Sequence, residues 1–133
     1  EAVVVLNPDL LAVIPYVRKQ AMQLASKMRF VSAQLVALLT DDLWRRNAEH
    51  ANAMAARLAA AVDGAPGVTV TDVVQANAVF AILVPAVTVA LQQEHAFYVW
   101  NEATGQVRWM TSWQTTEADV DAFAARIREL AAP

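Results

Sequence analysis

The hydrophobic period changes in the middle of the chain, and this change constrains the fold more than any other feature. Up to residue 62 the apolar residues recur every three or four positions, as on one face of a helix. From residue 68 they fall in short β-branched and aromatic runs bounded by turn residues, which is typical of strands. We therefore expect an α+β fold: N-terminal helices over residues 8–62, then a small, mainly antiparallel sheet with helices on one face over residues 68–133.

Start and stop signals divide the first half into three helical stretches. Asn7 and Pro8 suit a helix start, and Pro15 is expected to kink or divide the helix that runs to about residue 23. A second helix is predicted over 26–39. The third follows Asp41 and Asp42 and ends before Gly64. Its predicted packed face is Trp44, Ala48, Ala51, Met54, Ala55, Leu58 and Val62.

The second half reads as four strands and two helices. The predicted strands are "VTVTDVV", "AVFAILV", "AFYVW" and "VRWMTSW", and "PAVTVALQQE" is a helix opened by proline. "NEATG" predicts a hairpin with Gly105 in the left-handed position. Thr116 and Asp119 approximate a capping box for the last helix. The predicted core face of that helix is Val120, Phe123, Ala124, Ile127 and Leu130.

Composition excludes several classes of function. No apolar run reaches the roughly 18 residues of a spanning helix, so no membrane partner is expected. A net charge of −3 argues against a general nucleic-acid binder. Cysteines are absent, which excludes disulfides and thiolate metal sites. A cytoplasmic protein is the expectation.

The first residues, "EAVVVL", read as an apolar strand with no cap or turn ahead of it. Such a strand needs partners on its edges, and this chain offers few. We expect that the chain is a fragment of a longer protein and that residues 1–6 pair elsewhere. No linker is visible inside residues 1–133, so a single domain is predicted.

Arg108 is the main candidate for chemistry. Strand alternation places Val107, Trp109 and Thr111 on one face and Arg108, Met110 and Ser112 on the other. A solvent-facing edge arginine is the ordinary interpretation. A guanidinium among large apolar groups is also well suited to hold a carboxylate in a bidentate fork.

Other candidates are weaker. Arg18, Lys19, Lys27 and Arg29 could bind an anion such as phosphate, or be solvated positions or inter-subunit ion pairs. His50 and His95 form no metal or catalytic set. No nucleophile triad and no glycine-rich phosphate loop is present. The tryptophans are interpreted as core or interface residues.

Several segments together resemble a known family. They are "VVVLNPDLL", "RKQAMQLASKMRFVSAQLVALL", "LWRRNAEHANAMAARLAAAV", "VQANAVFAIL" and "VRWMTSWQTTEADVDAFAARI". In this order the chain resembles the C-terminal part of the threonine aldolase and β-eliminating lyase family. These are pyridoxal-phosphate enzymes of the aspartate-aminotransferase fold, fold type I. The chain would then be their C-terminal small domain, with residues 1–6 a strand of the missing large domain's sheet.

The resemblance implies roles for three residues. Arg108 matches the arginine that grips the substrate's α-carboxylate. Lys19 and Arg29 match basic residues at the active site, that of a neighbouring subunit in a homo-oligomer. Many members have a glycine-rich run before Met-Arg where this chain has "QLASK", so Lys19 is harder to place than Arg29. The Schiff-base lysine of the family has no counterpart here, so no catalytic residue is assigned and the chain alone is expected to be inactive.

The parent reaction implied by the resemblance is retro-aldol cleavage of a β-hydroxy-α-amino acid, such as threonine to glycine and acetaldehyde. Two alternatives stay open. One is another fold type I pyridoxal-phosphate enzyme, an aminotransferase or a different β-eliminating lyase. The other is a free-standing interaction module that docks through the aromatic hairpin and the basic cluster.

Overall fold

The computed structural model describes residues 3–132, and the chain divides into two compact units. We call Glu1–Asp41 the N-terminal unit and Asp42–Pro133 the C-terminal unit. The division falls in a short 3-10 turn, Thr40–Asp42, where Asp41 and Asp42 have φ of 50° and 56°. No proline, glycine or serine run marks this point in the sequence, so the division was not foreseen. That residues 1–133 form one domain of a longer enzyme stays a prediction.

The N-terminal unit is helical but has no core of its own. It contains a 3-10 turn, Pro8–Leu10, and two helices, α1 (Ile14–Gln20) and α2 (Met28–Leu39). Pro15 lies in the first turn of α1, so the predicted helix over 8–23 is divided there. Every described residue of this unit is exposed or half-buried.

The strand predicted over residues 1–6 is not formed by the residues that the structure describes. Residues 3–7 lie in neither helix nor strand, and residues 1 and 2 lie outside the described residues. A strand exists through its ladder of hydrogen bonds, and no described strand of this chain pairs with this segment. Pairing with a sheet outside this chain stays a prediction.

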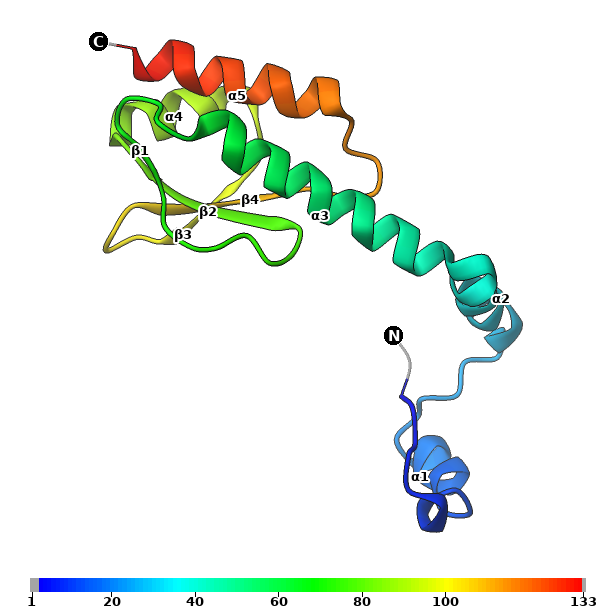
Figure 1. Cartoon of the computed structure of the whole chain (residues 1–133). Coiled ribbons are helices and arrows are strands. Elements are labelled where there is room, and N and C mark those ends of the chain that lie inside the picture. The colour runs from blue at the N-terminus through cyan, green and yellow to red at the C-terminus, as the bar shows by residue number, and fades with distance from the viewer. Residues whose placement is uncertain (1–2, 133) are drawn as a thin grey trace. The chain divides into compact units, whose positions relative to one another are not determined.

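The C-terminal unit confirms the α+β prediction. Its order is α3 (Leu43–Val62), β1 (Val68–Val70), β2 (Ala78–Leu83), α4 (Pro85–Glu94), β3 (Tyr98–Asn101), β4 (Gln106–Met110) and α5 (Glu117–Ala131). The strands pair antiparallel in the order β1-β2-β4-β3. The helices of this unit lie on one side of the sheet (Figure 1). The predicted capping box is present, because Thr116 Oγ1 accepts from Asp119 N at 3.1 Å and Asp119 Oδ2 accepts from Thr116 N at 2.9 Å.

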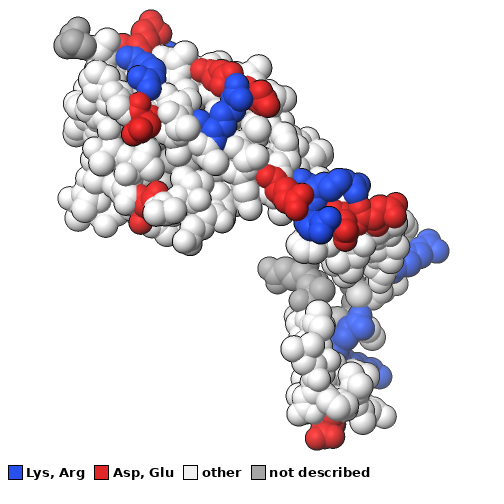
Figure 2. Space-filling view, viewed as in Figure 1, with Lys and Arg blue, Asp and Glu red and all other residues white. Residues whose placement is uncertain are grey.

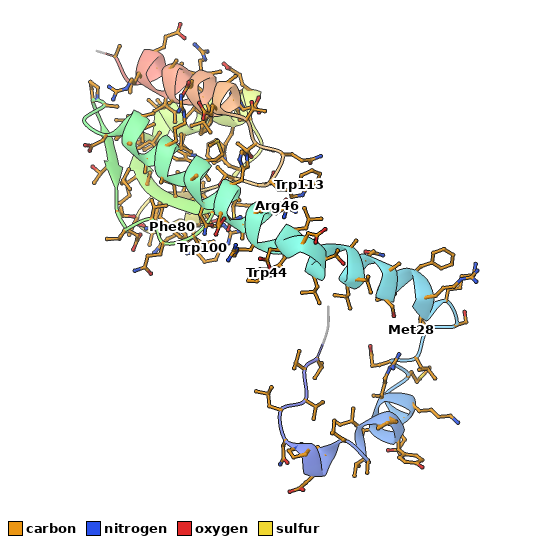
Figure 3. The ribbon with its side chains drawn as sticks, turned by 45° about the vertical axis from the view of Figure 1, so that its right-hand side comes forward. Met28, Trp44, Arg46, Phe80, Trp100 and Trp113 are labelled. Atoms are coloured by element: carbon orange, nitrogen blue, oxygen red, sulfur yellow. The ribbon has the colours of Figure 1, made fainter. Side chains whose placement is uncertain are left out.

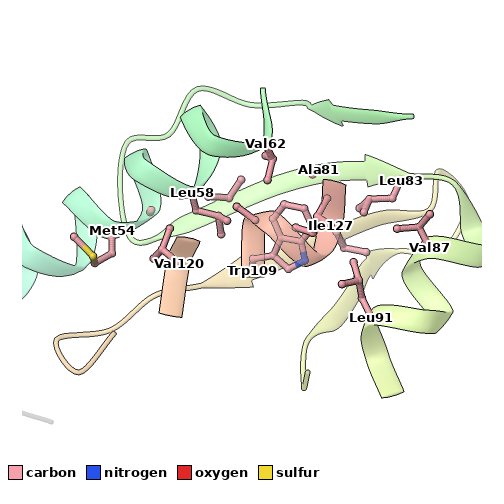
Figure 4. Close-up of a cluster of buried hydrophobic side chains, with 14 residues drawn as sticks. Met54, Leu58, Val62, Ala81, Leu83, Val87, Leu91, Trp109, Val120 and Ile127 are labelled. Carbon is pink, nitrogen blue, oxygen red and sulfur yellow. The ribbon is translucent and has the colours of Figure 1, made fainter. Parts of the chain in front are cut away.

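The core lies between the sheet and these helices (Figure 4). Strand alternation aims one set of side chains inward, and amphipathic helices cover them. The buried residues come from α3, β2, α4, β4 and α5: Met54, Ala55, Leu58, Val62, Val79, Ala81, Leu83, Val87, Leu91, Val107, Trp109, Val120, Ala124 and Ile127. Alternation sends the remaining strand side chains to the opposite face of the sheet, which the helices of this unit leave uncovered. We call it the open face.

Two predicted core positions on α3 are wrong. Trp44 is 50% exposed and Ala48 is exposed, whereas Ala51 and later members of the predicted face are buried. The helical period is correct there, but the first turns of α3 have no partner element within the described C-terminal unit. Periodicity identifies a face, and only the fold decides where along the helix that face is covered.

Charged side chains gather over the helices of this unit and are few over the strands in the view of Figure 2. Arg57 on α3 donates to both carboxylate oxygens of Asp121 on α5, each at 2.8 Å. Arg126 on α5 binds Glu94 at the end of α4, with Nη2 to Oε1 at 2.6 Å. These hydrogen bonds hold the pKa values of Asp121 and Glu94 below their ordinary values. They join the helices to one another on the side away from the sheet's open face.

Candidate substrate-binding site

Arg108 lies on the open face of the sheet. It is in β4, between β2 and β3, and pairs in register with Phe80 on one side and Tyr98 on the other. Its neighbours Val107 and Trp109 are 0% and 3% exposed, so they point into the core. Alternation therefore sends Arg108 away from the helices, as the sequence predicted. Its residue is half-buried, which excludes a side chain extended into bulk water.

The guanidinium of Arg108 stacks on Trp100. Its central carbon lies 4.2 Å from the centre of the Trp100 ring. Phe80 packs edge-on against Trp100. Their ring centres are 5.7 Å apart and the interplanar angle is 65°. Figure 3 shows Phe80 and Trp100 together at the strands. An aromatic face attracts a cation and restricts where the guanidinium plane can lie.

A bulge brings Trp100 to this position. The pairing of β3 with β4 runs Tyr98 to Arg108 and Val99 to Val107, and then shifts so that Asn101 pairs with Gln106. Trp100 has no residue opposite it in this register. An extra residue in one strand bends that strand and redirects its side chain. The bulge thus sets the Trp100 ring over Arg108.

The side-chain nitrogens of Arg108 have no hydrogen-bond or ion-pair partner among the described residues. Nε is buried and makes no hydrogen bond. The Nη atoms are not among the buried groups without a partner, and no ion pair of the described residues involves Arg108. A cation without a carboxylate, flanked by aromatic rings, is an arrangement that an incoming anion can complete.

A hollow of about 400 Å³ lies on the same side of the C-terminal unit. Its wall includes Phe80, Trp100 and Gln106, together with the loop between β1 and β2. Gln106 Nε2 donates to Thr71 Oγ1 at 2.7 Å and to Asp72 Oδ2 at 3.2 Å. These hydrogen bonds connect β4 to that loop, and Asp72 accepts one of them. The open face is therefore concave beside the aromatic residues that hold Arg108.

Lys19 and Arg29 lie in the N-terminal unit, so they belong to a different compact unit from Arg108. Both side chains are exposed. Arg29 is in the first turn of α2 and its guanidinium carbon lies 5.0 Å from the ring centre of Phe30. Arg18, another member of the basic cluster, donates from Nε to the Gln23 carbonyl at 3.0 Å. Their predicted roles at a neighbouring active site stay predictions.

The other predicted site assignments can be placed as well. His50 Nε2 donates to the Thr115 carbonyl at 2.7 Å, and the His95 ring packs edge-on against Phe123 at 4.8 Å. Both histidines therefore have packing roles. Within residues 3–132 no group of three or more His, Cys, Asp or Glu is placed to hold a metal ion. In the same range, none of the helices combines the length and apolar character needed to cross a membrane.

Trp100 and Phe80 were not recognised in the sequence as parts of this site. Tryptophan was interpreted only as a core or interface residue, and Trp100 is 55% exposed. Alternation alone could have placed Tyr98 and Trp100 on one face of their strand. The contact of Trp100 with Arg108 depends on the strand order and on the bulge, and no local sequence pattern predicts either of them.

The C-terminal unit is an antiparallel sheet with helices on one face and Arg108 on the other, an α+β arrangement that agrees with the fold type I of pyridoxal-phosphate enzymes. In structure, the chain is similar to a threonine aldolase from Leishmania major, with a TM-score of 0.64 and 27% identity, over 72% of this chain and 29% of that one.

Sequence comparison finds two curated relatives that share one name. The chain is 43% identical to a low-specificity L-threonine aldolase of Pseudomonas sp. over 129 residues, which is 96% of this chain and 37% of that protein. It is 43% identical over 132 residues to the enzyme of the same name from Pseudomonas aeruginosa, 98% of this chain and 36% of the relative. No family model matches the chain. The chain is homologous to the C-terminal part of the low-specificity L-threonine aldolases, and it spans little more than a third of their length.

Proposed function

We propose that the protein to which this chain belongs is a lyase that cleaves β-hydroxy-α-amino acids, with threonine giving glycine and acetaldehyde. The homology to two enzymes named as low-specificity L-threonine aldolases supports this activity. The observation that carries the role of this chain is the half-buried guanidinium of Arg108, which has no hydrogen-bond or ion-pair partner in the described residues.

Arg108 binds the α-carboxylate of the substrate in this proposal. A guanidinium donates two parallel hydrogen bonds to a carboxylate, and such charge-assisted bonds are stronger where water is excluded. The aromatic surfaces of Trp100 and Phe80 exclude water from one side of the pair. A fixed carboxylate fixes the orientation of the bond that is to be broken. Among residues 3–132 we assign no base for the β-hydroxyl.

Pyridoxal phosphate is the cofactor of this proposal, but the residues of this chain do not supply its covalent site. Lys19 and Lys27 are the lysines of the sequence, and both are exposed in the N-terminal unit. Neither matches the Schiff-base lysine of the family. We infer that the cofactor is bound by the missing large domain, so that this chain alone is inactive.

The partners follow from the same proposal. Lys19 and Arg29 contribute to the active site of a neighbouring subunit in a cytoplasmic homo-oligomer. The substrate is a small amino acid, with neither nucleic acid nor membrane as a partner.

The test is made on the full-length protein, purified with pyridoxal phosphate and offered a panel of amino acids. We expect glycine and acetaldehyde from threonine, and glycine with the matching aldehyde from other β-hydroxy-α-amino acids. The 133-residue chain should give no aldimine absorbance with added cofactor. Transfer of the amino group to a keto acid would instead identify an aminotransferase. A complete, monomeric protein of 133 residues without turnover would support an interaction module.

A further inference from the structure

We propose that Trp100 is a positioning residue, which orients the guanidinium of Arg108 for the substrate's carboxylate without neutralising it. This inference rests on the proposed role of Arg108 as the carboxylate anchor. It goes further in assigning the orientation of that anchor to one aromatic side chain on the neighbouring strand.

A bidentate grip by Arg108 requires that its side chain be oriented. A long side chain has several rotatable bonds, and a bidentate grip needs the guanidinium plane to be held. In the described part of the chain no carbonyl or carboxylate accepts a hydrogen bond from Arg108. The contact that does hold it is the stack on Trp100, with 4.2 Å from the guanidinium carbon to the ring centre.

An aromatic ring is better suited to orient Arg108 than an acid is. A carboxylate beside Arg108 would fix its direction, but it would also compete with the substrate's carboxylate for the same donors. The indole face attracts the cation and leaves its hydrogen-bonding edges unpaired. The nearby acid, Asp72, is occupied by hydrogen bonds from Gln106 and Thr71. The charge of Arg108 therefore stays available.

A ligand can reach only some of the donors of Arg108. Nε of Arg108 is buried, whereas neither Nη atom is among the buried atoms without a partner. The guanidinium thus presents its Nη1 and Nη2 edge. Because the guanidinium carbon lies 4.2 Å from the centre of the indole ring, the directions open to this edge are restricted, which suits the parallel fork of an arginine–carboxylate pair.

Trp100 is itself held. Phe80 packs against it with ring centres 5.7 Å apart, and the bulge between Val99 and Asn101 fixes its backbone. Phe80 also pairs in register with Arg108. The three side chains come from three adjacent strands, so the arrangement is rigid for the same reason that the sheet is.

The experiment uses the full-length holoenzyme and two variants of similar bulk, Trp100→Phe and Trp100→Leu. Phenylalanine keeps an aromatic face, and leucine keeps an apolar side chain without one. We expect Trp100→Leu to raise KM for threonine by about 3- to 30-fold, the range of a partly desolvated cation–π contact. We expect kcat of Trp100→Leu to change less than its KM. The KM of Trp100→Phe should stay close to that of the parent enzyme.

A cycle with Arg108→Ala separates positioning from packing. In the Arg108→Ala background, Trp100→Leu should leave KM unchanged, since the residue that it orients is gone. Trp113→Leu, at a tryptophan of the same unit that is 61% exposed, is the matched control and should leave KM unchanged. Equal increases in both backgrounds, no increase at all, or equal effects of phenylalanine and leucine would overturn the role of Trp100. An unchanged KM in Arg108→Ala alone would overturn the anchor itself, and the role of Trp100 with it.

Discussion

At the scale of single residues, the turn after α3 is packed closely against Val84 at Gly67. The φ of Gly67 is +65°, and a Cβ built there would lie 2.9 Å from Cγ2 of Val84. Gly64 has nearly the same φ, +67°, with open space around it. The two glycines share the left-handed backbone conformation, and they differ in the contact that an added Cβ would make.

Gly67→Ala should therefore destabilise the chain more than Gly64→Ala. The shared cost of alanine in the left-handed region is about 1–2 kcal/mol. The clash with a β-branched side chain, which is stiff, adds to it at Gly67 alone. Urea unfolding of the two variants measures the difference, and Val84→Ala should remove it. Equal losses for the two glycines would show that Val84 moves aside without cost.

The direction of Arg108 could be predicted from the sequence because a strand alternates, so the faces of Val107 and Trp109 fix the face between them. The partner of Arg108 could not be predicted. Trp100 reaches Arg108 through the order β1-β2-β4-β3 and a bulge, both of which depend on contacts distant in sequence. Local patterns report which way a side chain points and not what it meets.

At the scale of elements, Arg126 and Glu94 join α5 to the end of α4. The hydrogen bond from Arg126 lowers the pKa of Glu94. A carboxylate whose pKa is lower in the folded than in the unfolded state stabilises the fold at pH above its ordinary value, about 4.3, and this stability is lost as pH falls through the lowered pKa.

Glu94→Gln should therefore lower the free energy of unfolding at pH 7, and the difference from the parent should shrink as the pH falls below about 4. Urea unfolding of both proteins over a pH series is the measurement. Glu102→Gln, in the exposed hairpin between β3 and β4, is the control and should show neither effect. A difference for Glu94→Gln that stays constant down to pH 2 would contradict a role for its charge.

Most helices and strands of the C-terminal unit could be predicted from local sequence patterns. The strands, α4 and the capping box of α5 follow from local signals and are present, although β1 ends at Val70 and β4 at Met110, short of the predicted ends at residues 74 and 113. The differences between the predicted and observed elements have a common cause, which is the absence of a partner within the described chain. Residues 3–6 form no strand, and Trp44 is not in the core, because no described element pairs with the first segment or covers the start of α3 within its unit.

At the scale of the whole chain, the two units differ in what they bury. The C-terminal unit has a continuous core from five of its elements. No described residue of the N-terminal unit is buried, and Val3, Leu6 and Met22 are 88–89% exposed. Burial of apolar surface is the main source of stability, so the N-terminal unit lacks what a self-sufficient domain needs.

A chain of residues 42–133 should therefore fold cooperatively, whereas a peptide of residues 1–41 should not. Thermal unfolding followed by near-ultraviolet circular dichroism detects the packed Trp109 in the first, and far-ultraviolet spectra report helix in the second. We expect one sharp transition for 42–133 and none for 1–41. A sharp transition in the short peptide would show that its stability comes from sources other than a buried core.

Recognition of a carboxylate by Arg108 can be measured directly. In the full-length enzyme, threonine and threoninamide differ at that group alone, so the ratio of their kcat/KM values measures its recognition. The account predicts a preference for threonine of about 10- to 100-fold, as for a charge-assisted hydrogen bond, that is lost in Arg108→Ala and kept in Arg45→Ala, an exposed arginine of α3. A preference that is unchanged in Arg108→Ala would contradict it.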